Sequence, residues 1–600
     1  MAWFWRLIVI VINLKTNGLM PYTLKRIILL LLLLGPLLGA KAQNMKNYDK
    51  LVGESEQFID QKIKSDSVVG FCVAMIAGDS VILEKGYGLA DKEHNVPMTI
   101  HTVVNIGSVT KTFTALALMQ LYGKGIIDIN QPLINYFPEF HPMSTGNDLR
   151  KVTVRSVITH TSGIQSDILK NSDLNSGKYT DVVSFINKTY LIYPPGMVGL
   201  YSNSGYNILG NLIKVMSKQD YPVYVHRYIF DALGMSSSGF ATDPLVNRAK
   251  LYAKGKVVTE YELRDIASGG IYSNIDDMVK YARALMDAYN GKTSPLISPG
   301  TVRQMFALQN AAVPIETNKK GLGWFMFKND SAFAVFHSGS AGFAHANILM
   351  IPGKRFAVIT LTNTAEGGSM AENFCFNLLG KFQLSLADLF PPPVIKSVHK
   401  EIKIIRLSYD SLKKHEGDYA QAFSVVNIMT ENDHLTMTKD GKQYVLKPLS
   451  ANEFVPFERI KGDSLLRKDS IRYWFRDIDH YHVLFEENAT GEAPLGYRLT
   501  KFDPKIWMPR NGHYEQFGYQ LKAGDSKFLA VDLESTSSHG LMLKLTTSDG
   551  VTAIPLQYIS TVFAVTGGLS TSFGYTVKFS DNKNFRIVDF AGITFRKKKN

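Results

Sequence analysis

The sequence predicts a mixed α/β (α+β) fold: an antiparallel sheet flanked by helices with a helical subdomain, followed by C-terminal all-β domains. Three observations support this fold class. Strand patterns occur at 68–91 and again at 333–363, and helical patterns fill most of the chain between them. Beyond Pro391–Pro393 the chain has strand patterns throughout. A single sheet built from both ends of the first part, with a helical insertion, explains this order.

The N-terminal region, residues 1–42, is typical of a secretory signal peptide. Lys25 and Arg26 precede an apolar run of about 14 residues, which ends in an Ala-x-Ala pattern. The run is short for a membrane span. A second apolar run lies before Met20, so we expect the true start to be Met20. The protein is therefore expected to be exported, periplasmic or secreted, and to be membrane-associated if this segment is not cleaved.

Length and composition predict a folded, multidomain protein. Six hundred residues suggest three to four domains of about 150 residues each. The formal net charge of +13 gathers at the two ends: residues 1–42 carry five cations and no acid, and residues 596–599 carry four more cations. No basic block occurs elsewhere, so we expect no nucleic-acid partner.

The first part of the chain, residues 45–385, contains the predicted sheet and its helices. Two strands turn at Ala77–Ser80, where Gly-Asp separates two apolar runs. Three strands return near the end of this part, and Pro352–Lys354 mark the last hairpin turn. Between them, helical patterns occupy the segments 108–125, 207–219 and 275–291.

The last part of the chain is predicted to consist of a linker and two β domains. Residues 386–402 are Pro-rich and form the linker. The segments 403–502 and 503–600 look weakly alike, because each has a Gly-x-Tyr near its start and ends on a strand. We expect tandem small β-barrels or sandwiches.

The sequence offers no pattern for a metal or a cofactor. Cys72 and Cys375 lie in apolar contexts and are expected to be buried free thiols, with a disulfide between them as an open alternative. We find no Cys-x-x-Cys, no His pair at metal spacing, no Gly-rich phosphate loop and no Gly-x-Ser-x-Gly elbow. We therefore expect neither a metal nor a cofactor.

Ser108 and Lys111 form a Ser-x-x-Lys pair just before an apolar run. Three positions apart on a helix, the two side chains share one face. A helix N-terminus and a nearby amine both favour an alkoxide-like oxygen, and desolvation can make the amine a base. Ser108 could also be an ordinary helix cap. The same spacing recurs at Ser397–Lys400, Ser411–Lys414 and Ser580–Lys583, so the pair alone decides nothing.

Two further motifs follow in order. Tyr201-Ser202-Asn203 lies about 90 residues on, and His337-Ser338-Gly339 lies on a predicted strand. This series resembles the serine β-lactamase and penicillin-binding-protein superfamily, most closely its class C β-lactamase, esterase and D-peptidase branch. The resemblance covers roughly residues 50–380. Tyr-Ser-Asn also occurs at Tyr272–Asn274, where we expect a turn with Asn274 capping the next helix.

The resemblance implies a role for each motif residue. Ser108 would attack a carbonyl and form an acyl-enzyme, with Lys111 and Tyr201 sharing the general-base work. Asn203 would orient the substrate and the Lys111 amine. The backbone N–H groups of Ser108 and Ser340 would form the oxyanion hole. His337, Gly339 and Ser340 are the expected substrate-binding residues.

His337 departs from the pattern of many relatives, which have lysine at this position. A histidine with an unperturbed pKa is mostly neutral at pH 7, so it holds a substrate carboxylate less strongly than lysine does. This favours hydrolysis of an ester, an amide or a D-amino-acid peptide. A satisfied strand histidine is the alternative for His337.

The expected function is therefore that of an exported serine hydrolase acting on a small-molecule or peptide substrate. Three alternatives stay open. The first is a true β-lactamase or D,D-carboxypeptidase, and the second is a penicillin-binding receptor that acylates without turnover. The third is a protein whose β domains bind a glycan or peptide while the enzyme is secondary.

Overall fold

The computed structural model describes residues 48–599 apart from short internal stretches. These stretches are 66–67, 147, 170–176, 261, 317, 391–402, 461–463, 469, 489–490, 502, 518–527, 537–539 and 570–573. The chain divides into two units, Met1–Lys62 and Ile63–Asn600. Within the first unit, residues 48–62 are helical. The predicted signal peptide, and with it the proposed membrane association, lies outside the described residues, as does most of the predicted linker.

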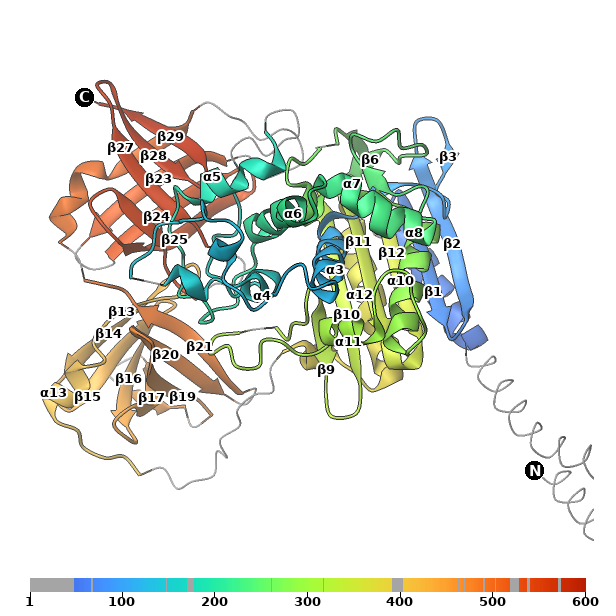
Figure 1. Cartoon of the computed structure of the whole chain (residues 1–600). Helices are drawn as coiled ribbons and strands as arrows, with labels where there is room; N and C mark the ends of the chain where they lie inside the picture. Colours follow the sequence, from blue (N-terminus) through green and yellow to red (C-terminus); the bar gives the residue numbers. More distant parts are fainter. Residues whose placement is uncertain are drawn as a thin grey trace, which may run out of the picture. The chain divides into compact units, whose positions relative to one another are not determined.

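A seven-stranded antiparallel sheet is built from both ends of the first part of the chain (Figure 1). In spatial order its strands are β3 (Val96–Pro97), β2 (Ser80–Asp91), β1 (Gly70–Ala77), β12 (Phe356–Thr362), β11 (Ala344–Ile351), β10 (Phe333–Ala341) and β9 (Phe325–Lys328). β1 pairs with β12 in the register Phe71↔Thr362. The single sheet predicted from the two sets of strand patterns is therefore confirmed, and β9 adds a fourth strand to the expected final three.

Helices cover both faces of the sheet. Every residue of β1 is buried, which requires a layer on each side. Phe71 packs edge-on against Phe374 of α12 (Gly367–Leu379), whereas Cys72 belongs to the large core that includes α10 (Ile275–Tyr289). Both Cys72 and Cys375 are buried free thiols, as predicted.

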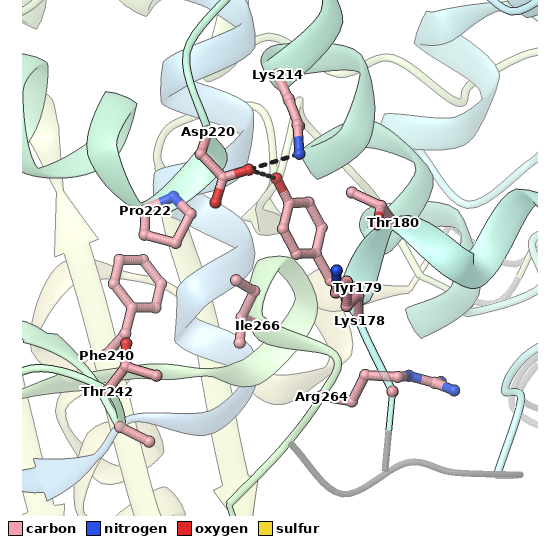
Figure 2. Close-up of a pocket in the computed structure, with 12 residues that line it drawn as sticks. Lys178, Tyr179, Thr180, Lys214, Asp220, Pro222, Phe240, Thr242, Arg264 and Ile266 are labelled. Carbon is pink, nitrogen blue, oxygen red and sulfur yellow. Dashed lines mark hydrogen bonds and ion pairs between the residues drawn. The ribbon is translucent and has the colours of Figure 1, made fainter. Parts of the chain in front are cut away.

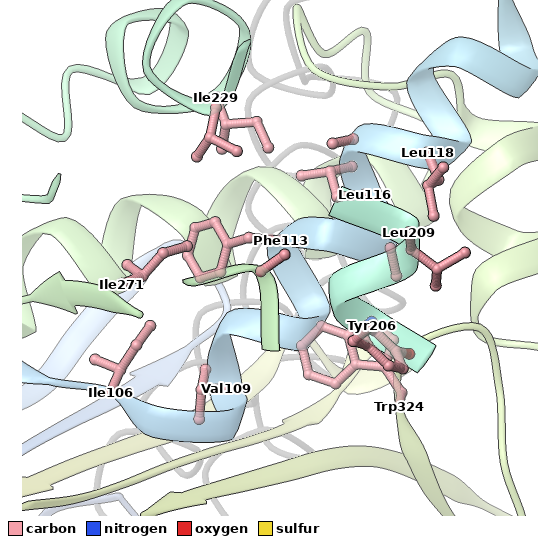
Figure 3. Packing of buried hydrophobic residues seen from close by; sticks show 14 of the residues in the cluster. Ile106, Val109, Phe113, Leu116, Leu118, Tyr206, Leu209, Ile229, Ile271 and Trp324 are labelled. Atoms are coloured by element: carbon pink, nitrogen blue, oxygen red, sulfur yellow. The ribbon is translucent and has the colours of Figure 1, made fainter. Parts of the chain in front are cut away.

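The core of the helical layer is α3 (Thr110–Gly123), which begins just after Ser108. Its residues are buried from Thr110 to Leu121, so the helix is surrounded by protein. Figure 3 shows Phe113, Leu116 and Leu118 of α3 among apolar side chains of neighbouring elements. Both α3 and α6 (Asn203–Ser217) pack against α9 (Ile266–Gly269), so three segments far apart in sequence meet here.

The helical subdomain gathers around α6. The other helices of the first part are α4 (Val154–Ile158), α5 (Val182–Ile186), α7 (Tyr221–Val225), α8 (Asp231–Leu233) and α11 (Pro299–Met305). Small strands complete it: β4 (Val104–Asn105), β8 (Ile271–Ser273) and β5 (Gly239–Phe240) form one sheet, and β6 (Leu251–Ala253) pairs with β7 (Lys256–Val258). α6 contacts α4, α5 and α7 as well as α3 and α9.

The C-terminal part consists of two up-and-down barrels. The strands of the first are β13 (Gly417–Ala420), β14 (Val425–Glu431), β15 (His434–Lys439), β16 (Lys442–Pro448), β17 (Glu453–Arg459), β18 (Leu465–Arg467), β19 (Arg472–Ile478), β20 (Tyr481–Asn488) and β21 (Gly491–Arg498). Pairing of β13 with β21 and of β16 with β17 closes the ring and leaves β18 at its edge. The helix α13 (Tyr409–Lys413) precedes it.

The second barrel is closed by the pairing of β22 with β29. Its strands are β22 (Gly512–Gln516), β23 (Phe528–Thr536), β24 (Gly540–Thr547), β25 (Gly550–Tyr558), β26 (Phe563–Thr566), β27 (Thr576–Asp581), β28 (Phe585–Phe590) and β29 (Ile593–Lys598). The Gly-x-Tyr pattern has the same role in both barrels. The Tyr419 and Tyr514 hydroxyls each donate to the carbonyl four residues earlier, that of His415 and that of Arg510. The predicted fold class, with all-β domains after the helix-flanked sheet, is confirmed.

An apolar cluster joins the first part of the chain to both barrels. Leu200 and Tyr193 share it with Val483 of the first barrel and Val565 of the second. In the part of the chain that the structure describes, no helix is both long enough and apolar enough to cross a membrane.

Candidate functional site

Ser108 lies in η2 (Gly107–Val109), a single 3-10 turn that leads directly into α3. Its hydroxyl does not cap a helix: the N-cap positions of η2 and α3 are Ile106 and Val109, and neither has a side-chain capping bond. Ser108 is half-buried. The alternative of an ordinary helix cap is therefore wrong, and the hydroxyl is available for other contacts.

The buried amine of Lys111 makes three short contacts. Its Nζ lies 3.0 Å from Ser108 Oγ, 2.6 Å from Asn203 Oδ1 and 2.7 Å from the Ser268 carbonyl oxygen. An amide oxygen and a carbonyl oxygen can only accept hydrogen bonds. In the neutral amine, two N–H bonds go to these two acceptors, so the lone pair faces the Ser108 hydroxyl. The neutral Lys111 amine is therefore placed to accept the proton of the Ser108 hydroxyl.

Burial also sets the charge of Lys111. The side chain is fully buried, and the resulting desolvation lowers its pKa to about 7. The carboxylates of Asp167 and Asp265 act in the opposite direction and limit the fall. A substantial fraction of the amine is therefore neutral near pH 7.

Tyr201 and Asn203 reach the site from the start of α6. Ser202 caps this helix by accepting a hydrogen bond from Gly205 N at 2.9 Å, and its own N–H donates to His160 Nδ1 at 3.0 Å. His160 thus contacts the Tyr201–Asn203 segment through this hydrogen bond and through its ring, whose centroid lies 4.3 Å from that of Tyr201. Burial raises the pKa of Tyr201, and the neighbouring Ser108 side chain opposes part of that rise.

The second Tyr-Ser-Asn segment has the structural role predicted for it. Asn274 precedes α10, and its Oδ1 accepts a hydrogen bond from Asp277 N at 2.9 Å. Tyr272 and Ser273 lie in β8. Of the other Ser-x-x-Lys pairs, Ser411 lies in the exposed first turn of α13 and Ser580 lies on β27, while Ser397 is outside the described residues.

The strand β10 passes directly against η2. A Cβ atom at Gly339 would lie 2.0 Å from the Ile106 oxygen and 2.8 Å from Ser108 N. A Cβ atom at Gly107, whose φ is +51°, would lie 2.5 Å from Ser340 N. Only glycines permit this approach, and it brings the backbone nitrogens of Ser108 and Ser340 to one place.

The hairpin register directs the Ser340 N–H toward η2. The turn between β10 and β11 has two residues, so its closing pair, Ala341↔Ala344, is the hydrogen-bonded type. Pair types alternate along an antiparallel ladder, and the next pair, Ser340↔His345, is therefore of the non-bonded type. The Ser340 N–H faces away from β11, where β9 has already ended.

His337 is a neutral, buried imidazole. It is 3% exposed, and desolvation together with the nearby Lys111 lowers its pKa to about 3. Its Nδ1 donates to the Ser338 carbonyl oxygen at 2.6 Å. The ring packs against that of Phe325, 5.4 Å away, and Phe325 stacks on Tyr201 at 6.4 Å. A substrate group near His337 would therefore lie against uncharged side chains.

Two residues of the site were missed by sequence reasoning. Asp167 accepts a hydrogen bond from Asn203 Nδ2 at 2.8 Å, and the Ser268 carbonyl accepts from Lys111. Ser268 contacts Lys111 through its backbone carbonyl, and a contact of this kind cannot be inferred from the residue type. The segment Gln165-Ser166-Asp167 has no distinctive spacing, so only the fold brings this carboxylate to Asn203.

A separate pocket lies beside the helical subdomain. It has a volume of about 500 Å³, and none of the seven predicted site residues lines it. Figure 2 shows Tyr179 and Lys214 in contact with the Asp220 carboxylate, at 2.8 and 3.0 Å. These three polar groups therefore bond to one another within the pocket. The described residues contain no cluster of His, Cys, Asp and Glu able to hold a metal ion.

Known proteins resemble this chain over its first part. The Beta-lactamase family model matches residues 56–377. Protein flp of Staphylococcus aureus (strain NCTC 8325 / PS 47) is 27% identical over 330 residues, which are 52% of this chain and 64% of that protein. Beta-lactamase-like protein 2 of Dictyostelium discoideum is 28% identical over 258 residues, 40% of this chain and 46% of that protein. The chain thus spans less than two thirds of these curated relatives.

Solved structures show a similar fold. The crystal structure of SurE has a TM-score of 0.53 and 21% identity, and covers 74% of this chain and 99% of its own. The structure of SurE with D-Leu has a TM-score of 0.52 at 22% identity, with 75% and 99% covered. The family model spans more than half of the chain and includes every predicted site residue. The chain therefore belongs to the Beta-lactamase family, within the serine β-lactamase and penicillin-binding-protein superfamily, and its fold supports a serine hydrolase-type function.

Proposed function

We propose that the protein is an exported serine hydrolase that acts through an acyl-enzyme on ester, amide or D-amino-acid peptide substrates. The observation that carries this proposal is the set of contacts around Lys111. Two obligate acceptors, Asn203 Oδ1 and the Ser268 carbonyl, leave the amine lone pair facing Ser108. A base with a pKa of about 7, held 3.0 Å from a hydroxyl, fits nucleophile activation at neutral pH.

In the acylation step, Ser108 Oγ attacks the substrate carbonyl carbon as its proton moves to Lys111 Nζ. The carbonyl oxygen becomes an oxyanion that the Ser108 and Ser340 N–H groups bind. The tetrahedral intermediate then collapses, the bond to the leaving group breaks, and the leaving group takes the proton. Tyr201 suits this transfer because its raised pKa keeps the phenol protonated beside Ser108.

In the deacylation step, water attacks the acyl carbonyl and gives its proton to the same base. The bond from the acyl carbon to Ser108 Oγ breaks, and the serine regains a proton. Asn203 keeps the Lys111 amine in place during both steps, since its Oδ1 lies 2.6 Å from Nζ. The acid product leaves, and the free enzyme is restored.

The neutral His337 supports the proposed substrate class. A lysine would supply a cation for a substrate carboxylate, whereas this buried imidazole, with its pKa lowered to about 3, stays uncharged. Penicillins and D-Ala-D-Ala peptides carry that carboxylate, and simple esters and amides do not. We therefore place esters and amides ahead of β-lactams and D-Ala-D-Ala peptides.

Burst kinetics test this function against its alternatives. The panel contains p-nitrophenyl esters, D-amino-acid amides including D-leucine amide, penicillin G and a D-Ala-D-Ala peptide. Steady turnover that is lost in Ser108→Ala and retained in Ser580→Ala supports the hydrolase. One stoichiometric burst without turnover would instead indicate a penicillin-binding receptor. No reaction with any acyl donor or with a fluorophosphonate probe would exclude both.

Export is tested by the N-terminal sequence of the mature protein. The proposal predicts cleavage after Ala42, with the protein recovered from the periplasm or the medium. An intact N-terminus on a protein in the membrane fraction would show that the segment is an anchor. Recovery of the intact chain from the cytoplasm would contradict export.

A further inference from the structure

The loop at 165–167 lies between the Tyr201–Asn203 segment and the second barrel. The Ser166 N–H donates to the Gly574 carbonyl at 3.0 Å, and the Ser166 carbonyl accepts from Ser204 N at 3.1 Å. Ser166 therefore bonds on one side to the barrel and on the other to the first turn of α6.

Gln165 has the same double contact. Its Oε1 accepts a hydrogen bond from Thr576 N at 3.3 Å, and its carbonyl accepts from Ser202 Oγ at 2.7 Å. Thr576 is the first residue of β27. Two successive loop residues thus connect the start of a barrel strand to the start of the helix that carries Asn203.

Asp167 makes the connection that ends at the nucleophile. The Tyr575 hydroxyl donates to its Oδ2 at 3.2 Å, and Asn203 Nδ2 donates to its Oδ1 at 2.8 Å. Asn203 Oδ1 in turn accepts from Lys111, which contacts Ser108. A continuous hydrogen-bonded series therefore runs from the second barrel to Ser108.

We propose that Tyr575 of the second barrel is a positioning residue of the active site, which acts through Asp167 to hold the Asn203 amide and the Lys111 amine in their working orientation. This inference rests on the function proposed above. The second barrel would then position Asn203 and Lys111 as well as pack against the first part of the chain.

The first effect is on the orientation of the Asn203 side chain. An ionised carboxylate only accepts hydrogen bonds, so the NH₂ group of Asn203 must face Asp167 and its oxygen must face Lys111. The flipped amide would place its NH₂ group against the Lys111 amine. Lys111 would then lose one of the two acceptors that direct its lone pair to Ser108.

The second effect is on the charge of Lys111. Burial raises the pKa of Asp167, and the hydrogen bonds from Asn203 and Tyr575 oppose that rise. The carboxylate in turn raises the pKa of Lys111. Loss of the Tyr575 hydroxyl therefore favours protonated Asp167 and lowers the pKa of Lys111.

The other ionisable groups around Lys111 do not reproduce this effect. The groups that face it are Asp265 before α9, Tyr201 and Tyr206 at α6, His160 after α4 and His337 on β10. Both histidines are neutral because burial lowers their pKa values, and burial keeps both tyrosines protonated. Asp265 also faces Asp167, but its carboxylate pairs with Arg264, whereas the Asn203 amide donates to Asp167.

Tyr575 is fixed in the second barrel by a backbone hydrogen bond and by ring packing. Its N–H donates to Thr566 Oγ1 at 3.0 Å, and its ring lies 5.1 Å from that of Phe590 on β28. The side chain is buried, and burial raises its pKa well above the ordinary value. Tyr575 therefore remains a protonated donor throughout the pH range of an assay.

The test compares Tyr575→Phe with Tyr514→Phe in the full chain. Both variants remove one hydroxyl from the same barrel, but the Tyr514 hydroxyl donates to the Arg510 carbonyl. We expect Tyr575→Phe to lower kcat/KM about tenfold, as loss of a hydrogen bond to a charged group does, with KM little changed. The acid limb of its pH profile moves to lower pH, and Tyr514→Phe matches wild type.

Tyr575→Phe combined with Asp167→Asn tests whether the Tyr575 hydroxyl acts through Asp167 or by direct contact with the substrate. Asp167→Asn alone should move the acid limb further than Tyr575→Phe does, and the double variant should match it. A Tyr575→Phe profile identical to that of Tyr514→Phe would overturn the inference, as would a raised KM with an unmoved acid limb. A wild-type enzyme inert to every acyl donor would overturn the proposed function itself, so the two failures are distinguishable.

Discussion

At Lys111, burial and two nearby carboxylates have opposite effects on the pKa of the amine. Removal of the amine from water disfavours its charged form, while the two carboxylates nearby favour it. The result is a pKa of about 7, between the value of an exposed lysine and that of a lysine buried without a partner. The chemistry of the site depends on this balance.

This balance predicts the acid limb of the pH profile. Only the neutral amine can accept the Ser108 proton, so kcat/KM should rise as pH increases through about 7 and then level off. Tyr201 should cause no loss at moderately alkaline pH because its pKa is raised. Steady-state kinetics from pH 5 to pH 9 check this. An acid limb near the pKa of an exposed lysine would contradict it.

His337→Lys tests the basis of substrate preference. A cation at this position should lower KM for a substrate with a carboxylate, relative to its uncharged ester, by about tenfold, the worth of one charge-assisted hydrogen bond. The added charge should also lower the pKa of Lys111 and destabilise the fold. His345→Lys is the matched control, because its side chain faces α12, next to Gly368. An unchanged KM ratio would refute this role for position 337.

The residues proposed to react could be found from the sequence, whereas two groups that hold them, the Asp167 carboxylate and the Ser268 carbonyl, could not. Ser108, Lys111, Tyr201 and Asn203 stand in recognisable motifs, and the structure brings them together. Asp167 could not be found, because its link to Asn203 depends on how a loop folds. In the second Tyr-Ser-Asn, Asn274 was assigned correctly as the cap of the helix that has Asp276 and Asp277 in its first turn.

At the scale of elements, the site depends on the close approach of β10 to η2. Two glycines, Gly107 and Gly339, let the backbone nitrogens of Ser108 and Ser340 share one region. Strand patterns placed β10 correctly in the sequence. The close approach of β10 to η2 could not be predicted. It depends on the lack of a side chain at Gly107 and Gly339, and no residue pattern shows that these two glycines meet.

Gly339→Ala should separate these two elements. Its Cβ would lie 2.0 Å from the Ile106 oxygen, so β10 must move away from η2 and the Ser340 N–H leaves its place. We expect kcat to fall by about 10²–10³, as for loss of one oxyanion donor. Gly353→Ala is the control, because no atom lies within 4 Å of its added Cβ. An active Gly339→Ala enzyme would refute the proposed oxyanion hole.

At the scale of the whole molecule, an apolar cluster joins the first part of the chain to the barrels. Leu200 is buried in this cluster, and a Cβ atom at Gly574 would lie 2.6 Å from its side chain. The sequence revealed two related β domains through their Gly-x-Tyr patterns. Their contact with the active-site loop could not be foreseen, because the residues involved are ordinary apolar and polar ones.

This cluster predicts cooperative unfolding. Leu200→Ala should lower the free energy of unfolding by about 2–5 kcal/mol, as for other buried leucines. The hydrolase part and the barrels should then unfold in one transition, displaced to lower urea concentration. Tryptophan fluorescence and circular dichroism in urea measure this. Val246→Ala, at an exposed valine, is the control. Two separate transitions, with the barrels unaffected by Leu200→Ala, would contradict the coupling.

Acylation of Ser108 is the central step of the proposed mechanism. Mass spectrometry of the full-length protein after brief exposure to an acyl donor, followed by peptide mapping, tests this directly. We predict a single adduct whose mass equals the acyl group, located on Ser108, absent in Ser108→Ala and present in Ser580→Ala. An adduct on any other residue, or one that survives Ser108→Ala, would contradict the account.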